Sequence, residues 1–174
     1  MHSSYQNHYN NLYNKLVELS RNIFFYKNVM LKDNFETRIN LIFVHFSIIL
    51  IIFKKSKINF SQKVFDNIFL NIEYHIRELG HGDVTVNKKM KILTRIFYDI
   101  LLKIHKPDTQ DFNINKKILE TYFGQAKNNG PQLIDNLTDY FSNFYNFCFE
   151  LTSDNMLKGK INFNFLQKNG STKT

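Results

Sequence analysis

Apolar residues recur at three- and four-residue spacing along most of this chain, which is the period of an amphipathic α-helix. Leu12, Leu16 and Leu19 show the pattern in a first predicted helix over about residues 9–26. Further helices are predicted over about 33–55, 61–79, 85–106, 115–123 and 130–151. The pattern therefore predicts an all-α, single-domain bundle of about six helices over residues 11–167, with flexible ends at 1–10 and 168–174.

The most apolar stretch lies in the second predicted helix, where His45 and Ser47 interrupt residues 41–53. At about 1.5 Å per residue this run spans roughly 20 Å, short of the roughly 30 Å hydrocarbon core of a bilayer. A helix that is apolar on all sides is usually surrounded by other elements. We therefore predict a central core helix. The alternative is an interfacial element whose Lys54, Lys55 and Lys57 touch anionic headgroups.

Capping residues mark several predicted helix boundaries. Asp33 and Glu36 have the spacing of a capping box at the start of the second helix. Ser61 is a suitable N-cap for the third helix, and Gly80 stands where a left-handed C-cap would end it. Pro107 is expected to stop the fourth helix.

The last long helix is expected to open at Pro131, because proline suits the first helical position. Beyond this helix, residues 160–165 alternate between polar and apolar like a strand. No partner strand is visible in the sequence, so we predict an extended C-terminal tail that packs on the bundle.

The composition leaves the kind of partner open. The 174 residues include 18 Phe and 9 Tyr but no Trp, and 23 Lys or Arg against 15 Asp or Glu give a formal charge of +8. This charge suits nucleic acid, ribosomal RNA or an anionic membrane surface. It equally suits a soluble protein whose lysine content reflects the codon bias of an AT-rich genome.

Cysteine usage and the N-terminus point to a reducing compartment. Cys148 is the one cysteine, so no intramolecular disulfide or cysteine-based metal site can form. Its neighbours Phe147 and Phe149 favour a buried, inert thiol. Residues 1–11 lack the apolar segment of a secretory signal. The expected location is cytoplasmic, with peripheral contact at the inner membrane, or the mitochondrial matrix in a eukaryote.

The titratable residues do not form a recognisable catalytic or metal-binding motif. His75 and His81 lie near Glu73 and Glu78, but the His-Glu-x-x-His pattern of metalloproteases is absent. There is no phosphate-binding glycine loop and no nucleophile elbow. His45, on an apolar helix, is expected to be a core histidine. We therefore expect no catalytic residue, metal or cofactor.

The turn between the third and fourth predicted helices has a clear physical logic. Gly80 can adopt a positive φ without a steric penalty, and Gly82 allows a tight reversal. Asp83 can accept hydrogen bonds from nearby amides or lie at the positive start of the next helix. Arg77 and Glu78 close the preceding helix beside it. A connection between antiparallel helices would explain all of these residues.

The cations that follow the turn need a further explanation. Lys88, Lys89, Lys91 and Arg95 gather within two helical turns. We interpret this basic cluster as a candidate docking surface for RNA, a membrane or an acidic partner.

The aromatic residues suggest a second interaction surface. The predicted helices carry more aromatic stripes than a small bundle easily buries, and large exposed apolar patches usually mark partner sites. Phe43, Phe46, Phe65 and Phe69 are the candidates for lining a groove that receives an apolar client helix. The alternative is that all of them belong to the core.

Several segments, taken together and in order, resemble the ubiquinol–cytochrome c chaperone family. The turn with Gly80, Gly82 and Asp83 resembles the signature loop of that family, and the other matching segments are 12–26, 35–38, 41–53, 86–91, 97–98 and 151–163. Asn87 stands where the family usually has glycine, and Leu79 where it usually has methionine.

The resemblance implies an all-α assembly factor for the cytochrome bc1 complex that is not an enzyme. Its expected client is newly made cytochrome b, and the expected contact residues are Arg77, Glu78, Gly80, Gly82 and Asp83 of the turn together with the basic cluster that follows it. The other partners that the resemblance implies are a small helical protein and the ribosome. The compact length resembles bacterial, in particular alphaproteobacterial, members. The alternative from the charge pattern is a basic helical module that binds RNA, the ribosome or a membrane surface through Lys88, Lys89, Lys91 and Arg95.

Overall fold

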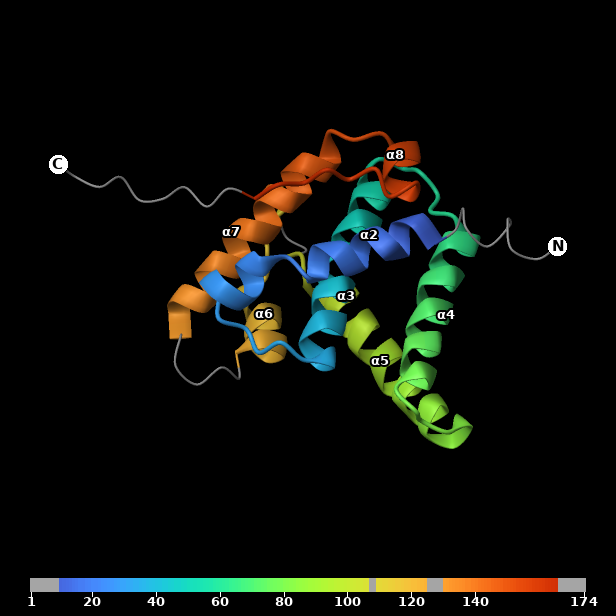
Figure 1. Ribbon diagram of the computed structural model, residues 1–174. Helices are drawn as coiled ribbons and strands as arrows, with labels where there is room; N and C mark the ends of the chain where they lie inside the picture. Colours follow the sequence, from blue (N-terminus) through green and yellow to red (C-terminus); the bar gives the residue numbers. More distant parts are fainter. Residues whose placement is uncertain (1–9, 107–108, 125–129, 166–174) are drawn as a thin grey trace.

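The computed structural model describes residues 10–106, 109–124 and 130–165 (Figure 1). Within these ranges the chain is all-α, as predicted, and lacks strands. Its elements are α2 (Asn10–Ser20), the π-helical segment η1 (Phe24–Asn28), α3 (Phe35–Lys55), α4 (Gln62–Glu78), α5 (Asp83–Lys103), α6 (Lys116–Phe123), α7 (Gly130–Phe149) and α8 (Ser153–Leu157). The predicted flexible ends lie outside the described residues, except that Asn10 begins α2. Pro107, the predicted stop of the fourth helix, also lies outside them.

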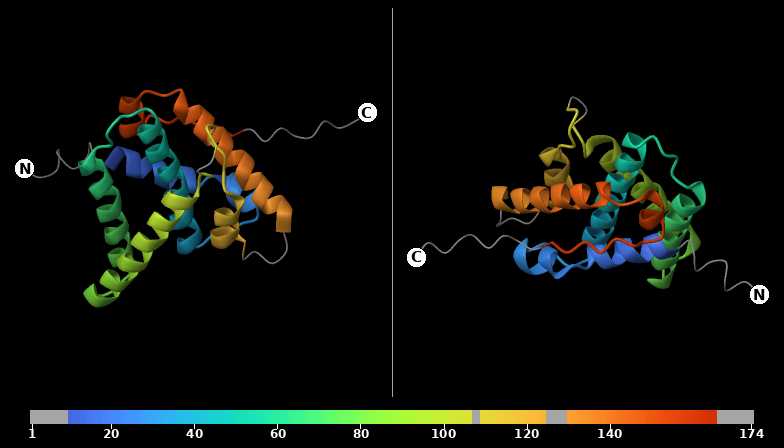
Figure 2. Two further views of the ribbon diagram at one scale, coloured as in Figure 1. Left: turned by 180° about the vertical axis from the view of Figure 1, so that it is seen from behind. Right: turned by 90° about the horizontal axis from the view of Figure 1, so that it is seen from above.

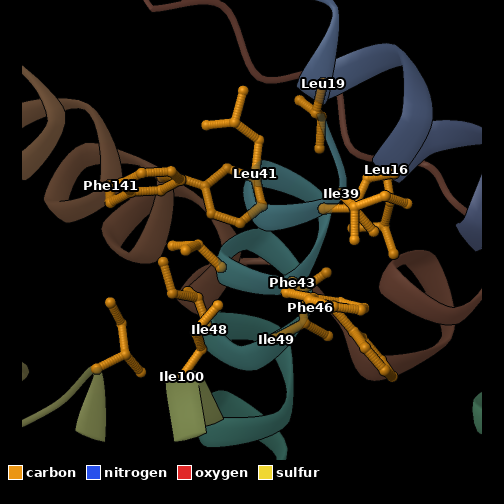
Figure 3. Close-up of a cluster of buried hydrophobic side chains, with 14 of the residues drawn as sticks. Leu16, Leu19, Ile39, Leu41, Phe43, Phe46, Ile48, Ile49, Ile100 and Phe141 are labelled. Atoms are coloured by element: carbon orange, nitrogen blue, oxygen red, sulfur yellow. The ribbon is translucent and has the colours of Figure 1, made fainter. Parts of the chain in front are cut away.

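Helix α3 is the centre of the structure, which confirms the prediction for the apolar run. It packs against α2, α5, α6 and α7, and nearly every residue from Ile39 to Phe53 is buried. Figure 3 shows side chains of α2, α5 and α7, such as Leu16, Ile100 and Phe141, around α3. Among the described helices, α3 is long and apolar enough to cross a bilayer. Here most of its surface is covered by protein.

The core histidine was also predicted correctly. The Nδ1 atom of His45 lies 2.7 Å from the Leu41 carbonyl oxygen, and its Nε2 atom lies 3.0 Å from the Tyr140 hydroxyl. If Nδ1 donates to the carbonyl, Nε2 accepts from the hydroxyl, so both ring nitrogens are satisfied in the neutral form. Complete burial lowers the pKa of His45 to about 4.

The predicted caps are correct for α4 but not for α3. Ser61 accepts a hydrogen bond from the Val64 amide, 3.4 Å away, at the start of α4. At the start of α3 the cap is Asn34, whose Oδ1 accepts from the Thr37 amide at 2.8 Å. Asp33 instead binds Arg38 through two hydrogen bonds of 2.7 and 3.0 Å. The capping box predicted at Asp33 is therefore wrong by one residue.

The first predicted helix is shorter than expected, because α2 ends at Ser20. The Asn22 side chain accepts from the Phe24 amide at 2.9 Å, and the chain then forms a π turn in which the Val29 amide donates to the Phe24 carbonyl. Phe24 and Phe25, the first two residues of this segment, are both buried in the core.

The C-terminal tail packs on the bundle in an extended form, as predicted. Ile161 is buried, and the centroid of the Phe163 ring lies 5.3 to 5.4 Å from the ring centroids of Phe144 and Tyr140. The short helix α8, capped by Thr152, was not predicted. It ends near Gly159, where the tail backbone comes against the start of α2.

Candidate partner-binding surface

The turn after α4 is built around Gly80. Helix α4 ends at Glu78 with Leu79 as its C-cap, and Gly80 has a φ of +88°, the left-handed conformation that was predicted. Gly82 is the N-cap of α5 with an extended φ of −74°. No atom lies within 4 Å of a Cβ built on it. The turn therefore requires glycine at position 80 but not at position 82.

Helix α5 begins at Asp83, earlier than the predicted start at 85–87. The Asp83 carboxylate takes the first-turn position that the sequence suggested and also binds the Arg77 guanidinium. Arg77 binds Glu73 as well, with an Nη2–Oε1 distance of 2.7 Å. These hydrogen bonds to Asp83 and Glu73 raise the pKa of Arg77. Arg77 thus ties the end of α4 to the start of α5.

The turn lies at the far end of the α4–α5 hairpin, where the two helices converge away from α7 and α8 (Figures 1 and 2). Glu78, Gly80, Gly82 and Asp83 are exposed, and Arg77 is half-buried. Two apolar side chains beside them, Leu79 and Val84, are also exposed. The surface therefore combines charged groups with apolar groups that could contact a partner.

The four cations of the basic cluster do not all lie on the same side of α5. Lys88, Lys91 and Arg95 are exposed along one side of α5, whereas Lys89 is turned about 100° from Lys88 and is half-buried. None of these cations forms an ion pair with any residue in the described ranges. The structure therefore brings together Lys88, Lys91 and Arg95 and leaves Lys89 apart.

The aromatic residues predicted to line a client groove form part of the core instead. Phe43 and Phe46 are completely buried, and Phe65 and Phe69 are partly buried against them. Phe97 of α5 covers this cluster, with ring centroids 5.1 to 5.8 Å from all four phenylalanines. The groove expectation is therefore wrong for Phe43 and Phe46, because α5 fills the space that an open groove would need.

A cavity of about 380 Å³ lies where α2, the start of α3 and the end of α4 meet. Its apolar lining includes Val17, Phe35, Ile39 and Leu79, so the cavity adjoins the exposed turn. The sequence did not predict this cavity, because its walls come from three segments that are far apart in the chain. The cavity is also lined by two cations, Arg21 and Arg38, and by the ring of His75. The His75 ring stacks on the Phe35 ring with 5.4 Å between the two centroids.

The described residues contain no group of three or more His, Cys, Asp or Glu side chains placed to hold a metal ion. Cys148 is fully buried, as predicted, and this burial raises the pKa of its thiol to about 12. A thiol with that pKa is almost entirely protonated near neutral pH and is a poor nucleophile.

The chain was compared with models of known protein families. A model of the ubiquinol-cytochrome C chaperone family matches residues 27–163, from the end of η1 to the C-terminal tail, and this match includes the α4–α5 turn. A search of curated proteins and a search of solved structures each return no match. Because the family match spans well over half of the 174 residues, this chain belongs to the ubiquinol–cytochrome c chaperone family.

Proposed function

We propose that this protein is a non-enzymatic assembly chaperone that binds newly made cytochrome b and supports assembly of the ubiquinol–cytochrome c reductase complex. The family match over residues 27–163 is the observation that carries the proposal, since membership implies a chaperone role in assembly of that complex. The proposed site of action is the cytoplasmic face of the inner membrane, or the mitochondrial matrix face in a eukaryote. A small helical protein is a proposed additional partner.

The proposed client surface is the α4–α5 turn together with the adjoining cavity. Leu79 belongs to both, because it is exposed at the turn and also lines the cavity. An apolar side chain of the client would enter the cavity against Val17 and Ile39 and leave water. Arg77 and Asp83 would bind polar groups at the rim. Capture lowers the concentration of free client and so opposes its aggregation.

The test is affinity capture of cytochrome b from detergent-solubilised cells, comparing wild type with Asp83→Lys. The new lysine would face Arg77, break the link between α4 and α5, and repel cations of the client. We expect at least a tenfold loss of captured cytochrome b with unchanged helicity by circular dichroism.

Asp154→Lys is the matched control. Asp154 is also an exposed aspartate in the first turn of a helix, and it also binds a basic residue, Lys158, at 2.8 Å. This variant changes the net charge equally but lies outside the proposed surface, so it should capture cytochrome b like wild type. Equal capture by wild type and Asp83→Lys would show that the turn is only a connection between helices.

A ribosome- or RNA-binding role is the second candidate. It is favoured by Lys88, Lys91 and Arg95, which form no ion pair within the part of the chain that the structure describes. Binding to a polyanion falls steeply as salt concentration rises, because counterions are released on binding. Capture of an apolar client depends much less on salt. Recovery of ribosomal RNA alone, eluted by salt and without cytochrome b, would favour this second function.

A further inference from the structure

One face of α5 is exposed along its whole length. Its residues follow at intervals of three or four, so they share one side of the helix. This outer face of α5 consists of Val84, Lys88, Lys91, Arg95, Tyr98 and Leu102, all of them exposed. Val84 and Leu102, at its two ends, are the most exposed apolar side chains on it, at 70% and 77%. At about 1.5 Å per residue the face is roughly 27 Å long.

The orientation of this face is fixed by the opposite side of the helix. Val86, Phe97 and Ile100 are completely buried there, and α5 packs against α3. Turning the outer face inward would expose these core side chains to water, which is unfavourable. The exposed apolar residues on α5 therefore remain on the surface of the folded protein.

The cations of the outer face are available to a partner. The acidic residues of α5 are already engaged, because Asp83 binds Arg77 and Asp99 binds both Lys103 and the Tyr122 hydroxyl. The hydrogen bonds from Lys103 and Tyr122 lower the pKa of Asp99, so it remains ionised and occupied. No carboxylate among the described residues forms an ion pair with Lys88, Lys91 or Arg95.

We propose that the outer face of α5 is a docking surface for an anionic lipid bilayer. Lys88, Lys91 and Arg95 would contact the headgroups, and Val84 and Leu102 would enter the boundary with the acyl chains. Tyr98 would lie at headgroup depth, where amphipathic rings are favoured. RNA would use the cations but would gain little from exposed Val84 and Leu102, and these apolar ends favour a bilayer. The proposal goes beyond the chaperone function and does not depend on the identity of the client.

The test is co-sedimentation of the purified full chain with vesicles of phosphatidylcholine, with and without phosphatidylglycerol. One variant is K88Q/K91Q/R95Q. Each cation near an anionic surface changes affinity by about fivefold, so the variant should bind anionic vesicles about 100-fold more weakly than wild type. Vesicles of phosphatidylcholine alone should bind wild type weakly.

A matched variant separates the outer face from net charge. K27Q/K32Q/K63Q also removes three positive charges at exposed lysines that form no ion pair with a described residue. It should keep affinity for anionic vesicles within a few-fold of wild type. Equal losses in the two triple variants would overturn the proposal, because only net charge would then matter. Absence of wild-type binding to anionic vesicles would overturn it as well.

The apolar contribution is measured with Leu102→Ser, and Ile58→Ser is the control at another exposed apolar residue. We expect Leu102→Ser to bind anionic vesicles several-fold more weakly and Ile58→Ser to bind like wild type. A single-stranded RNA oligonucleotide is added as a competitor. If Leu102→Ser has no effect and RNA displaces the protein from vesicles, the face serves RNA and the bilayer proposal fails. The capture of cytochrome b in detergent involves no bilayer, so the two proposals fail separately.

Discussion

His45 is the buried residue whose ionisation should control stability. Its folded-state pKa of about 4 lies below the ordinary value of 6.5, because burial disfavours the charged ring. The stability that its neutral form provides is therefore complete above pH 6.5 and is lost as the pH falls toward 4. We expect this one group to lower the free energy of unfolding by up to about 3 kcal/mol over that range. Urea denaturation between pH 7 and 4 measures the loss.

The test variant is His45→Phe, which should remove most of this pH dependence because phenylalanine carries no titratable group. A His45→Phe variant with an unchanged slope between pH 6.5 and 4 would mean that another group carries the effect.

Gly80 and Gly82 show how far the sequence alone could identify the turn. The amphipathic pattern that ends at Gly80 predicted its left-handed φ correctly. It also suggested that Gly82 is needed, whereas the φ of Gly82 is extended and the space around it is open. Whether the second glycine of such a turn is constrained depends on where the next helix begins, and α5 begins earlier than its apolar pattern indicates.

The two glycines should therefore respond in opposite directions to the same substitution. Gly80→Ser should lower stability by about 1 kcal/mol, because a side chain is strained at positive φ. Gly82→Ser should raise stability by about 0.5 kcal/mol, since the N-cap of α5 lacks a side-chain hydrogen bond that serine can supply. Thermal unfolding of both variants checks this pair. Equal effects would contradict the assignment of the turn.

At the scale of elements, periodicity predicted the existence of the helices better than their ends. The ranges of α4, α6 and α7 agree closely with the sequence pattern, and Ser61 and Pro131 mark the starts of α4 and α7. The first helix was predicted too long, because apolar residues continue at helical spacing past Ser20 into η1, where Phe24 and Phe25 are buried. Helix α8 was missed because five residues are too few to show a period.

The packing of the C-terminal tail on α2 depends on Gly159. Its φ is +67°, and a Cβ built on it would lie 2.5 Å from the Asn11 carbonyl oxygen. Gly159→Ala should therefore lower the free energy of unfolding by about 2 kcal/mol or more, because both the backbone strain and the clash oppose it. Chemical denaturation measures the effect, with Lys158→Ala as the exposed neighbouring control. A near-neutral Gly159→Ala would mean that the tail can detach from α2 without cost.

At the scale of the whole molecule, the sequence predicted the all-α fold and the family but not the surfaces. The cavity between α2, α3 and α4 is formed by segments far apart in the chain. A local sequence pattern cannot predict which distant segments come into contact. The same holds for Phe43 and Phe46, because only the position of α5 decides whether these residues are covered. The basic cluster was visible in the sequence. Which of its cations share the outer face of α5, and that Lys89 does not, is decided by the way α5 packs against α3.

The central position of α3 has a consequence for biosynthesis. A chain leaves the ribosome from its N-terminus, so α3 emerges before α5 and α7, which later cover it. During that interval the nascent protein presents a helix of 21 residues with the length and composition of a membrane span. Its solubility then depends on completing synthesis quickly or on temporary protection. Until α7 has been made, the nascent chain therefore resembles the apolar client that we propose for this protein.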